Sequence, residues 1–126
     1  MKFVLALAAA GALFASSLDT RLVDAEKKAD KTAVQELLAS HADVNAPQPD
    51  GATALHWAAY WDDLDTAKAV LAAGADPNAK NRYGVTPLSL ACTNGSAPMI
   101  GLLLDSKADV SLALPGGETP LMTAAR

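Results

Sequence analysis

The sequence predicts an all-α solenoid of stacked repeats that begins behind an apolar leader. Shifted against itself by 33 residues, the chain keeps its register without a gap. A fixed period of this length is typical of repeat architectures. Within each period, apolar residues recur at the three- and four-residue spacing that favours helices. The residues that recur at the fixed period are Thr53, Thr86 and Thr119; Leu55, Leu88 and Leu121; and Gly51, Gly84 and Gly117.

Residues 1–17 have the features of a secretory signal peptide. Lys2 supplies a positive charge, Phe3–Phe14 is an unbroken apolar run, and Ala15 and Ser17 are small residues suited to a cleavage site. An uncleaved anchor is the weaker alternative, because the run is short for a bilayer span. We therefore expect cleavage near Ser17 and a periplasmic or extracellular protein with no stable membrane anchor. The alanine-rich leader indicates a bacterial source.

The first repeat, residues 18–49, is degenerate. In its second helix, Ala33, Val34, Leu37 and Leu38 share one face at helical spacing. A terminal repeat needs a polar outer face, because no neighbour covers it. We expect a solvated cap here, with a charged binding site as the alternative. The cap would be formed by Asp24, Glu26, Lys27, Lys28 and Asp30.

The second repeat, residues 50–81, is the most regular. Thr53 is a candidate N-cap of its first helix, and Asp62 or Asp63 is a candidate N-cap of its second. Gly74 follows the second helix, where a left-handed residue commonly ends a helix.

The flanking repeats hold His41 and Lys107 at the position of Gly74. We expect both to adopt the same left-handed conformation, at a cost of roughly 1–2 kcal/mol relative to glycine.

The third repeat, residues 82–115, is predicted to begin its second helix at Ser96. The partial repeat 116–126 ends inside its first helix, without the polar capping repeat that a solenoid needs. We therefore expect the chain to be the N-terminal piece of a longer array; a short protein capped by its half repeat is the alternative. The apolar body of the third repeat's second helix is Met99, Ile100, Leu102, Leu103 and Leu104.

The T-A-L-H sequence at 53–56, its counterpart T-P-L at 86–88 and the 33-residue period together resemble the ankyrin repeat family. The resemblance covers about residue 18 to the end of the chain. It implies repeats of helix, turn, helix and hairpin tip, and a structural role for His56, which in the family ties the turn to the helix. It also implies non-catalytic binding of a protein partner.

In ankyrin-like arrays, partners bind the concave side, which is formed by the hairpin tips and the exposed ends of the first helices. Tyrosine, tryptophan and arginine are enriched at binding hot spots. The alternative is that Trp57 and Trp61 fill gaps around the alanines, and we expect Trp57 to belong to the core. By position, the predicted partner-binding residues are Tyr60, Trp61, Arg82, Tyr83, Val85, Thr93 and Asn94.

Composition argues against several other functions. A net charge of −4 without a long basic run gives no electrostatic basis for nucleic-acid binding. The single cysteine, Cys92, aligns with Ala59, so we expect a buried, inert thiol. His56 with the nearby aspartates could be drawn as a metal or acid–base group, but capping and local hydrogen bonds explain them better. Without a motif for catalysis or phosphate binding, we expect no enzyme, no cofactor and no metal.

The sequence therefore predicts an exported, non-catalytic protein–protein interaction module whose partner it does not identify. The alternative is a targeting or regulatory N-terminal array of a larger exported enzyme or redox protein, whose catalytic domain would lie beyond residue 126. A self-associating structural module is a weaker third hypothesis.

Overall fold

Six helices make up most of the part of the chain that this computed structural model describes, residues 19–112. Those residues contain no strand, so the predicted all-α class is confirmed. The leader and the partial fourth repeat lie outside the described residues. The helices are α2 (Arg21–Lys27), α3 (Lys31–Ala39), α4 (Ala54–Trp61), α5 (Leu64–Ala72), α6 (Pro87–Asn94) and α7 (Ala97–Asp105).

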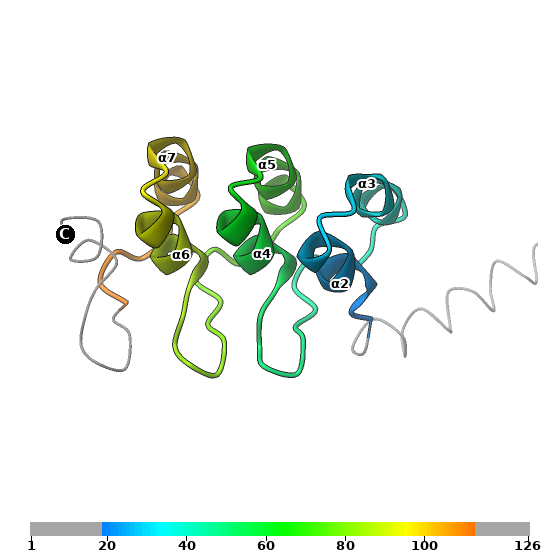
Figure 1. Cartoon of the computed structure of the whole chain (residues 1–126), viewed down its shortest axis with the longest axis horizontal. Coiled ribbons are helices and arrows are strands. Elements are labelled where there is room, and N and C mark those ends of the chain that lie inside the picture. Colours follow the sequence, from blue (N-terminus) through cyan, green and yellow to red (C-terminus); the bar gives the residue numbers. More distant parts are fainter. Residues whose placement is uncertain (1–18, 113–126) are drawn as a thin grey trace, which may run out of the picture.

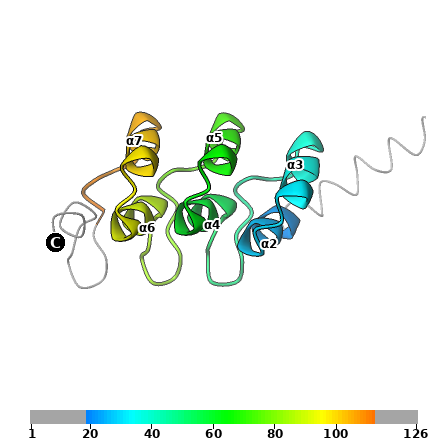
Figure 2. The same ribbon diagram turned by 45° about the horizontal axis from the view of Figure 1, so that its top comes forward.

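The helices lie in two layers, with hairpin tips below them. The first helix of each repeat (α2, α4, α6) forms one layer, and the second helices (α3, α5, α7) form the other (Figure 1). Helix α4 packs against both α2 and α6, so the first-helix layer joins the repeats. The connections from α3 to α4 and from α5 to α6 project as tips on the side of the first helices away from the second ones (Figures 1 and 2).

A side-chain cap starts every second helix at the same repeat position. Asp30, Asp63 and Ser96 each accept a hydrogen bond from the backbone amide three residues further on, at 3.2 or 3.3 Å. Such a cap satisfies one of the amides that a helix start leaves unpaired. Ser96 and Asp63 were both predicted as helix starts. Asp62, the other predicted cap, instead ends α4 in the left-handed conformation, with φ of 58°.

A residue with left-handed backbone follows each of the six described helices. The prediction for His41 and Lys107 is confirmed, since their φ angles are 60° and 75°. At each of the two equivalent positions, only one of the three repeats has glycine. The other two repeats have a residue with a Cβ atom, which the left-handed conformation disfavours. The sets are Ala29, Asp62 and Gly95 after the first helices, and His41, Gly74 and Lys107 after the second helices.

The core repeats position by position along the first-helix layer. Leu22, Leu55 and Leu88, one from each repeat, are exposed by 1%, 0% and 2%. Alanines three residues further on in each helix are also buried, and their small size lets neighbouring first helices approach closely.

Two predictions about exposure are wrong. Glu26, predicted to lie in the solvated cap, is 0% exposed because it faces the second repeat. Leu104, predicted as part of an apolar helix body, is 41% exposed because it lies on the outer side of α7, away from Met99 and Leu103.

Asparagine side chains join the repeats near the ends of the second helices. The Asn45 side chain accepts a hydrogen bond from the Asp76 amide at 2.7 Å and donates one to the Gly74 carbonyl at 3.0 Å. Asn78 repeats this pattern one repeat further along. These bonds set the spacing between repeats on one side of the stack.

The tips of the second and third repeats are also joined directly. The Arg82 amide donates to the Asp50 carbonyl at 2.7 Å. Beside this bond Gly51 has φ of 89°, and a Cβ atom there would lie only 3.0 Å from the Asn81 Cα atom. Glycine at this position therefore allows the close approach of the two tips.

Candidate functional site

His56 links the first helix of the second repeat to the tip of the third. Its Nδ1 accepts a hydrogen bond from the Thr53 amide at 3.0 Å, so the ring proton is on Nε2, which donates to the Val85 carbonyl at 2.8 Å. The ring is 2% exposed, and burial lowers the pKa of His56. Both ring nitrogens are thus occupied by backbone groups, as expected for a structural histidine.

An aromatic cluster, defined as Trp57, Tyr60 and Trp61, covers the C-terminal half of α4. The Tyr60 ring contacts Trp57 and Trp61 edge-on, with centroids 5.4 and 4.9 Å away, and the two tryptophan rings stack at 6.5 Å. Tyr60 is 50% exposed and Trp61 47% exposed. Trp57, which was predicted to belong to the core, is half-buried and packs against the edge of the core.

The first repeat and the tip before α4 hold this cluster in place. The Lys27 ammonium lies 5.6 Å from the centroid of the Trp57 ring, and the Lys27 carbonyl accepts a hydrogen bond from the Trp61 indole at 3.3 Å. The Trp57 indole donates to the Gln48 side chain at 2.9 Å. Neither Lys27 nor Gln48 was predicted to lie on this face. The 33-residue register could have placed Lys27 on this face, because Lys27 occupies in the first repeat the position that Tyr60 occupies in the second.

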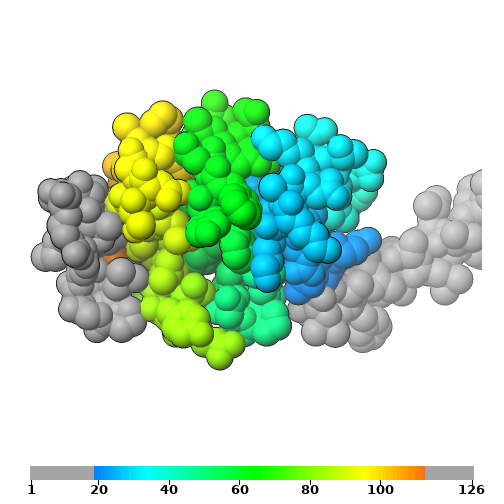
Figure 3. All heavy atoms as spheres, in the orientation of Figure 1, coloured from blue at the N-terminus to red at the C-terminus, as the bar shows by residue number. Residues whose placement is uncertain are grey.

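A pocket of about 270 Å³ lies between α4 and the tips. It is lined from the helix by His56, Trp57 and Tyr60, and from the tips by Asp50, Asn81 and Val85. Of these, only Tyr60 and Val85 were predicted for the site. In the space-filling view, the tips of the second and third repeats lie side by side at the lower edge of the molecule (Figure 3).

The third repeat's tip supplies the remaining exposed aromatic side chain of residues 19–112. Tyr83 is 60% exposed, and the Arg82 guanidinium lies 5.7 Å from the centroid of its ring. The Tyr83 amide bonds to the Asn81 side chain at 2.9 Å, which fixes the turn that presents the ring. Val85 is half-buried in the pocket wall.

Two of the predicted site residues, Thr93 and Asn94, make hydrogen bonds that serve the fold. The Asn94 amide nitrogen donates to the carbonyls of Ala59 and Tyr60, at 2.9 and 3.1 Å. It therefore caps the C-terminus of α4 from the next repeat. The Thr93 hydroxyl donates to the Ser89 carbonyl within its own helix at 2.9 Å. Both residues remain exposed on the same face as Tyr60.

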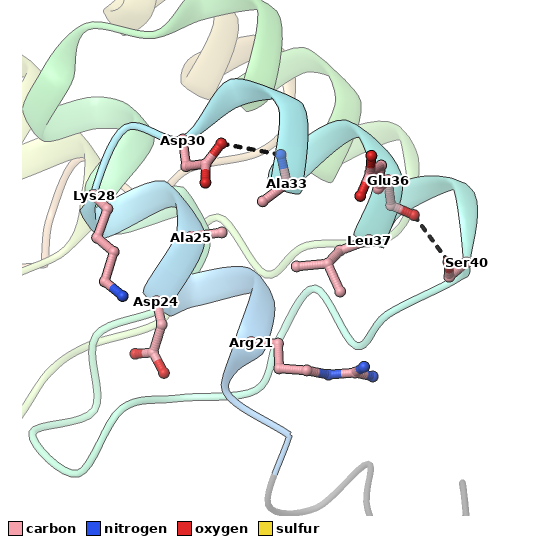
Figure 4. A pocket seen from close by; sticks show the side chains of 9 residues that line it. All are labelled: Arg21, Asp24, Ala25, Lys28, Asp30, Ala33, Glu36, Leu37 and Ser40. Atoms are coloured by element: carbon pink, nitrogen blue, oxygen red, sulfur yellow. Dashed lines mark hydrogen bonds between the residues drawn. The ribbon is translucent and has the colours of Figure 1, made fainter.

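A larger, open groove of about 500 Å³ lies on the outer face of the first repeat, between α2 and α3 (Figure 4). Charged side chains of both signs surround a floor of Ala25 and Leu37. Asp24 bonds to Thr20 and Gln48, and Asp30 caps α3. The groove thus has the mixed, solvated surface predicted for a terminal repeat, apart from the buried Glu26.

Residues 19–112 contain no group of three or more His, Cys, Asp or Glu side chains placed to hold a metal ion. Within the same range, no helix combines the length and hydropathy that a membrane span requires. Cys92 is buried, and burial raises the pKa of its thiol. A thiolate is the reactive form of cysteine, so this environment is that of a packing residue.

Comparison with known proteins agrees with the repeat architecture. Residues 22–71 and 55–104 each match a family model described as ankyrin repeats in many copies. The chain is 38% identical over 107 residues to the Neurogenic locus Notch protein of Drosophila melanogaster, an alignment that covers 82% of this chain and 4% of that protein. It is 39% identical over 84 residues to Neurogenic locus notch homolog protein 1 of Homo sapiens, covering 61% of this chain and 3% of that protein.

A plant relative shows the same relationship. The chain is 33% identical over 100 residues to the E3 ubiquitin-protein ligase KEG of Arabidopsis thaliana, covering 79% of this chain and 6% of that protein. The chain therefore spans only 3% to 6% of the length of these relatives.

Proposed function

This chain belongs to the ankyrin repeat family, whose repeats are in general protein–protein interaction modules, and from that premise we propose that it is a non-catalytic binding module for a protein partner. One observation carries the choice of surface. Tyr60, Trp61 and Tyr83 are each about half exposed, at 50%, 47% and 60%. Tyr60 lines the pocket on the side of the hairpin tips, Trp61 contacts Tyr60, and Tyr83 lies on the tip that supplies Asn81 and Val85 to the pocket wall. Large aromatic side chains contribute much of the energy at protein interfaces.

The proposed mechanism is rigid display of this surface. The tips are joined by the Arg82–Asp50 backbone bond, and His56 holds the third tip against α4. A surface that is already ordered loses little conformational entropy when a partner binds. The pocket of about 270 Å³ lies just below the usual range for small-molecule sites, so it suits a single side chain of a partner protein.

The predicted residues would divide into three roles. Tyr60, Trp61 and Tyr83 would be the anchors, with Arg82 beside them. Val85 and Thr93 would contact the partner around these anchors, and Asn94 would hold the end of α4 in position through its two bonds to carbonyl groups.

We also propose that the protein is exported and acts in a periplasmic or extracellular setting. The charge, apolar run and small residues of the leader support this assignment. Mass measurement of the protein purified from the cell envelope or medium of its host would test it. The expected mass lacks residues 1–17, whereas an intact N-terminus on a protein confined to the cytoplasm would contradict export.

A second candidate is that the repeats are the targeting or regulatory part of a larger exported protein, with catalysis located elsewhere in that protein. The relatives favour this candidate, because the matching segment is a small part of each of them. A transcript that reads through beyond codon 126 into a further domain would support it.

Photo-crosslinking in the native host would test the proposed surface. A photoreactive phenylalanine analogue would replace Tyr83 in one variant and Tyr60 in another. The matched control would carry it at Leu104, an exposed apolar position on α7. We expect one shared crosslinked protein from the first two variants and none from the control. Equal crosslinking at Leu104, or none at Tyr60 and Tyr83, would refute the surface.

A further inference from the structure

Glu26 is a buried carboxyl group at the contact between the first and second repeats. It occupies the position at which the next repeats have Ala59 and Cys92. Its side chain is 0% exposed, and neither carboxyl oxygen has a hydrogen-bond partner among the described residues. A buried, ionised carboxylate without partners is strongly destabilising, so the group is expected to keep its proton.

The surroundings of Glu26 also favour the neutral form. Burial, and then the nearby carboxylate of Asp63, raise the pKa of Glu26 to about 8. Glu26 is moreover in the last turn of α2, where the free carbonyl groups disfavour a negative charge.

The other groups that face Glu26 oppose this shift only weakly. Lys31, at the start of α3, lowers the pKa through its charge, and the nearby Thr66 hydroxyl, which donates its hydrogen bond to Asp63 at 2.7 Å, lowers it less. The Lys31 ammonium is 3.8 Å from Asp63 and is itself mostly exposed. The titratable residues of α4 lie elsewhere: His56 bonds to Val85, and Tyr60 is half exposed.

The residue after Glu26, Lys27, is one of the residues that hold the aromatic cluster. The Lys27 ammonium lies over the Trp57 ring, and the Lys27 carbonyl receives the Trp61 indole hydrogen bond. Any movement of the end of α2 away from α4 therefore withdraws two contacts from Trp57 and Trp61. The buried carboxyl and the exposed aromatic surface share one short segment of backbone.

We infer that Glu26 is a protonation switch for this surface: the neutral carboxyl allows α2 to pack on α4, and loss of its proton loosens that contact and releases Trp57 and Trp61. A charged Glu26 would lie beside ionised Asp63, and it regains solvation only if the end of α2 moves outward. The inference rests on the proposed function only in treating the aromatic cluster as a binding surface. The aromatic cluster is then ordered at low pH and loosened at high pH.

Tryptophan fluorescence of the full chain provides a direct test. Trp57 and Trp61 are the only two tryptophans, and both belong to the cluster. Emission wavelength and acrylamide quenching would be followed across the pH range on either side of the Glu26 pKa of about 8. We expect one transition, with redder emission and stronger quenching on the alkaline side, while circular dichroism shows that the helices persist.

Four variants separate Glu26 from other titrating groups. Glu26→Gln keeps the shape but cannot ionise, and Glu26→Ala restores the residue type of the second repeat; both should abolish the transition. Asp63→Asn keeps a capping side chain but removes the charge, so the midpoint should move to lower pH. Glu36→Gln, at an exposed position on α3, should behave like wild type.

The same transition in Glu26→Gln, or no transition in the wild-type chain, would overturn the inference. The readout needs no partner. If crosslinking at Tyr60 and Tyr83 fails while the transition follows Glu26, the proposed function is wrong and the switch stands. If crosslinking succeeds but the transition is absent, the proposed function stands and the switch is wrong.

Discussion

His56 donates a hydrogen bond from Nε2 to the Val85 carbonyl at 2.8 Å, which joins α4 of the second repeat to the tip of the third. The same ring accepts the Thr53 amide through Nδ1, so one side chain closes a local turn and an inter-repeat contact. The third repeat has Ser89 at this position, and its hydroxyl shares a hydrogen bond with the Thr86 hydroxyl of the same repeat at 2.9 Å.

Replacing His56 by alanine should lower the free energy of unfolding by about 1–3 kcal/mol, because it leaves buried backbone groups without their partners. Ser89→Ala is the matched control: it removes the hydrogen bond to Thr86 of the same repeat and should cost about 1 kcal/mol. Urea unfolding monitored by circular dichroism would measure both. Equal losses in the two variants would show that the bond to Val85 adds nothing.

Opposite substitutions at one repeat position should have opposite effects. Ala29 and Gly95 occupy equivalent left-handed positions, with φ of 57° and 70°. Ala29→Gly should stabilise the protein and Gly95→Ala should destabilise it, each by about 1 kcal/mol, because a Cβ atom disfavours this conformation. A Cβ atom at Gly95 would meet nothing within 4 Å, so a steric clash does not complicate the comparison.

The other set of left-handed positions allows the same comparison. His41→Gly and Lys107→Gly should each raise the melting temperature, and Gly74→Ala should lower it. Differential scanning calorimetry would detect these changes. An earlier melting transition in either glycine variant would contradict the assignment of strain to these positions.

Glu26 should also give the stability of the protein a specific pH dependence. Its pKa is raised from 4.5 to about 8 in the folded state, so between these values the folded chain holds a proton that the unfolded chain has lost. This contribution to stability is complete below pH 4.5, declines by about 1.4 kcal/mol per pH unit inside the window, and levels off above about pH 8.

Glu26→Gln should therefore remove a downward slope from the stability–pH curve. The measurement is urea unfolding of the wild type and the variant at several pH values within the window. The difference between the two curves should grow with pH in favour of the variant. A constant difference would mean that Glu26 ionises in the folded protein as it does in the unfolded chain.

Asn94 and Tyr83 should separate stability from binding. Asn94→Ala should cost about 1 kcal/mol of stability, because the carbonyls of Ala59 and Tyr60 lose their shared donor. Tyr83→Ala should change stability by no more than about 0.5 kcal/mol, since the side chain is 60% exposed. A large loss of stability in Tyr83→Ala would indicate that the ring serves the fold rather than a partner.

Much of the architecture could be predicted because it depends on local chemistry that the repeat displays several times. The N-caps Asp63 and Ser96, the left-handed positions at His41 and Lys107, and the buried Cys92 each follow from one residue and its place in the 33-residue register. The error at Glu26 has a different origin. A charged residue in a terminal repeat is expected to be exposed to solvent, but the Glu26 side chain lies on the inner side of α2.

The candidate surface was less predictable, because it is assembled from contacts between repeats. The sequence placed Tyr60, Trp61 and Tyr83 on one face by position alone. It did not indicate that Lys27 lies over Trp57, or that Asn94 bonds to the end of α4 instead of being free for a partner.

The sequence alone therefore determined the period, the helix pairs, their caps and the residue types that could meet a partner, since these depend on neighbours within a few positions along the chain. Only the tertiary structure decided which groups are joined across repeats: His56 to Val85, Lys27 to the aromatic cluster, and Glu26 to the environment of Asp63. Those contacts depend on how closely successive repeats stack. A difference of one side chain at that interface, glutamate instead of alanine, changes burial, charge and proton binding together.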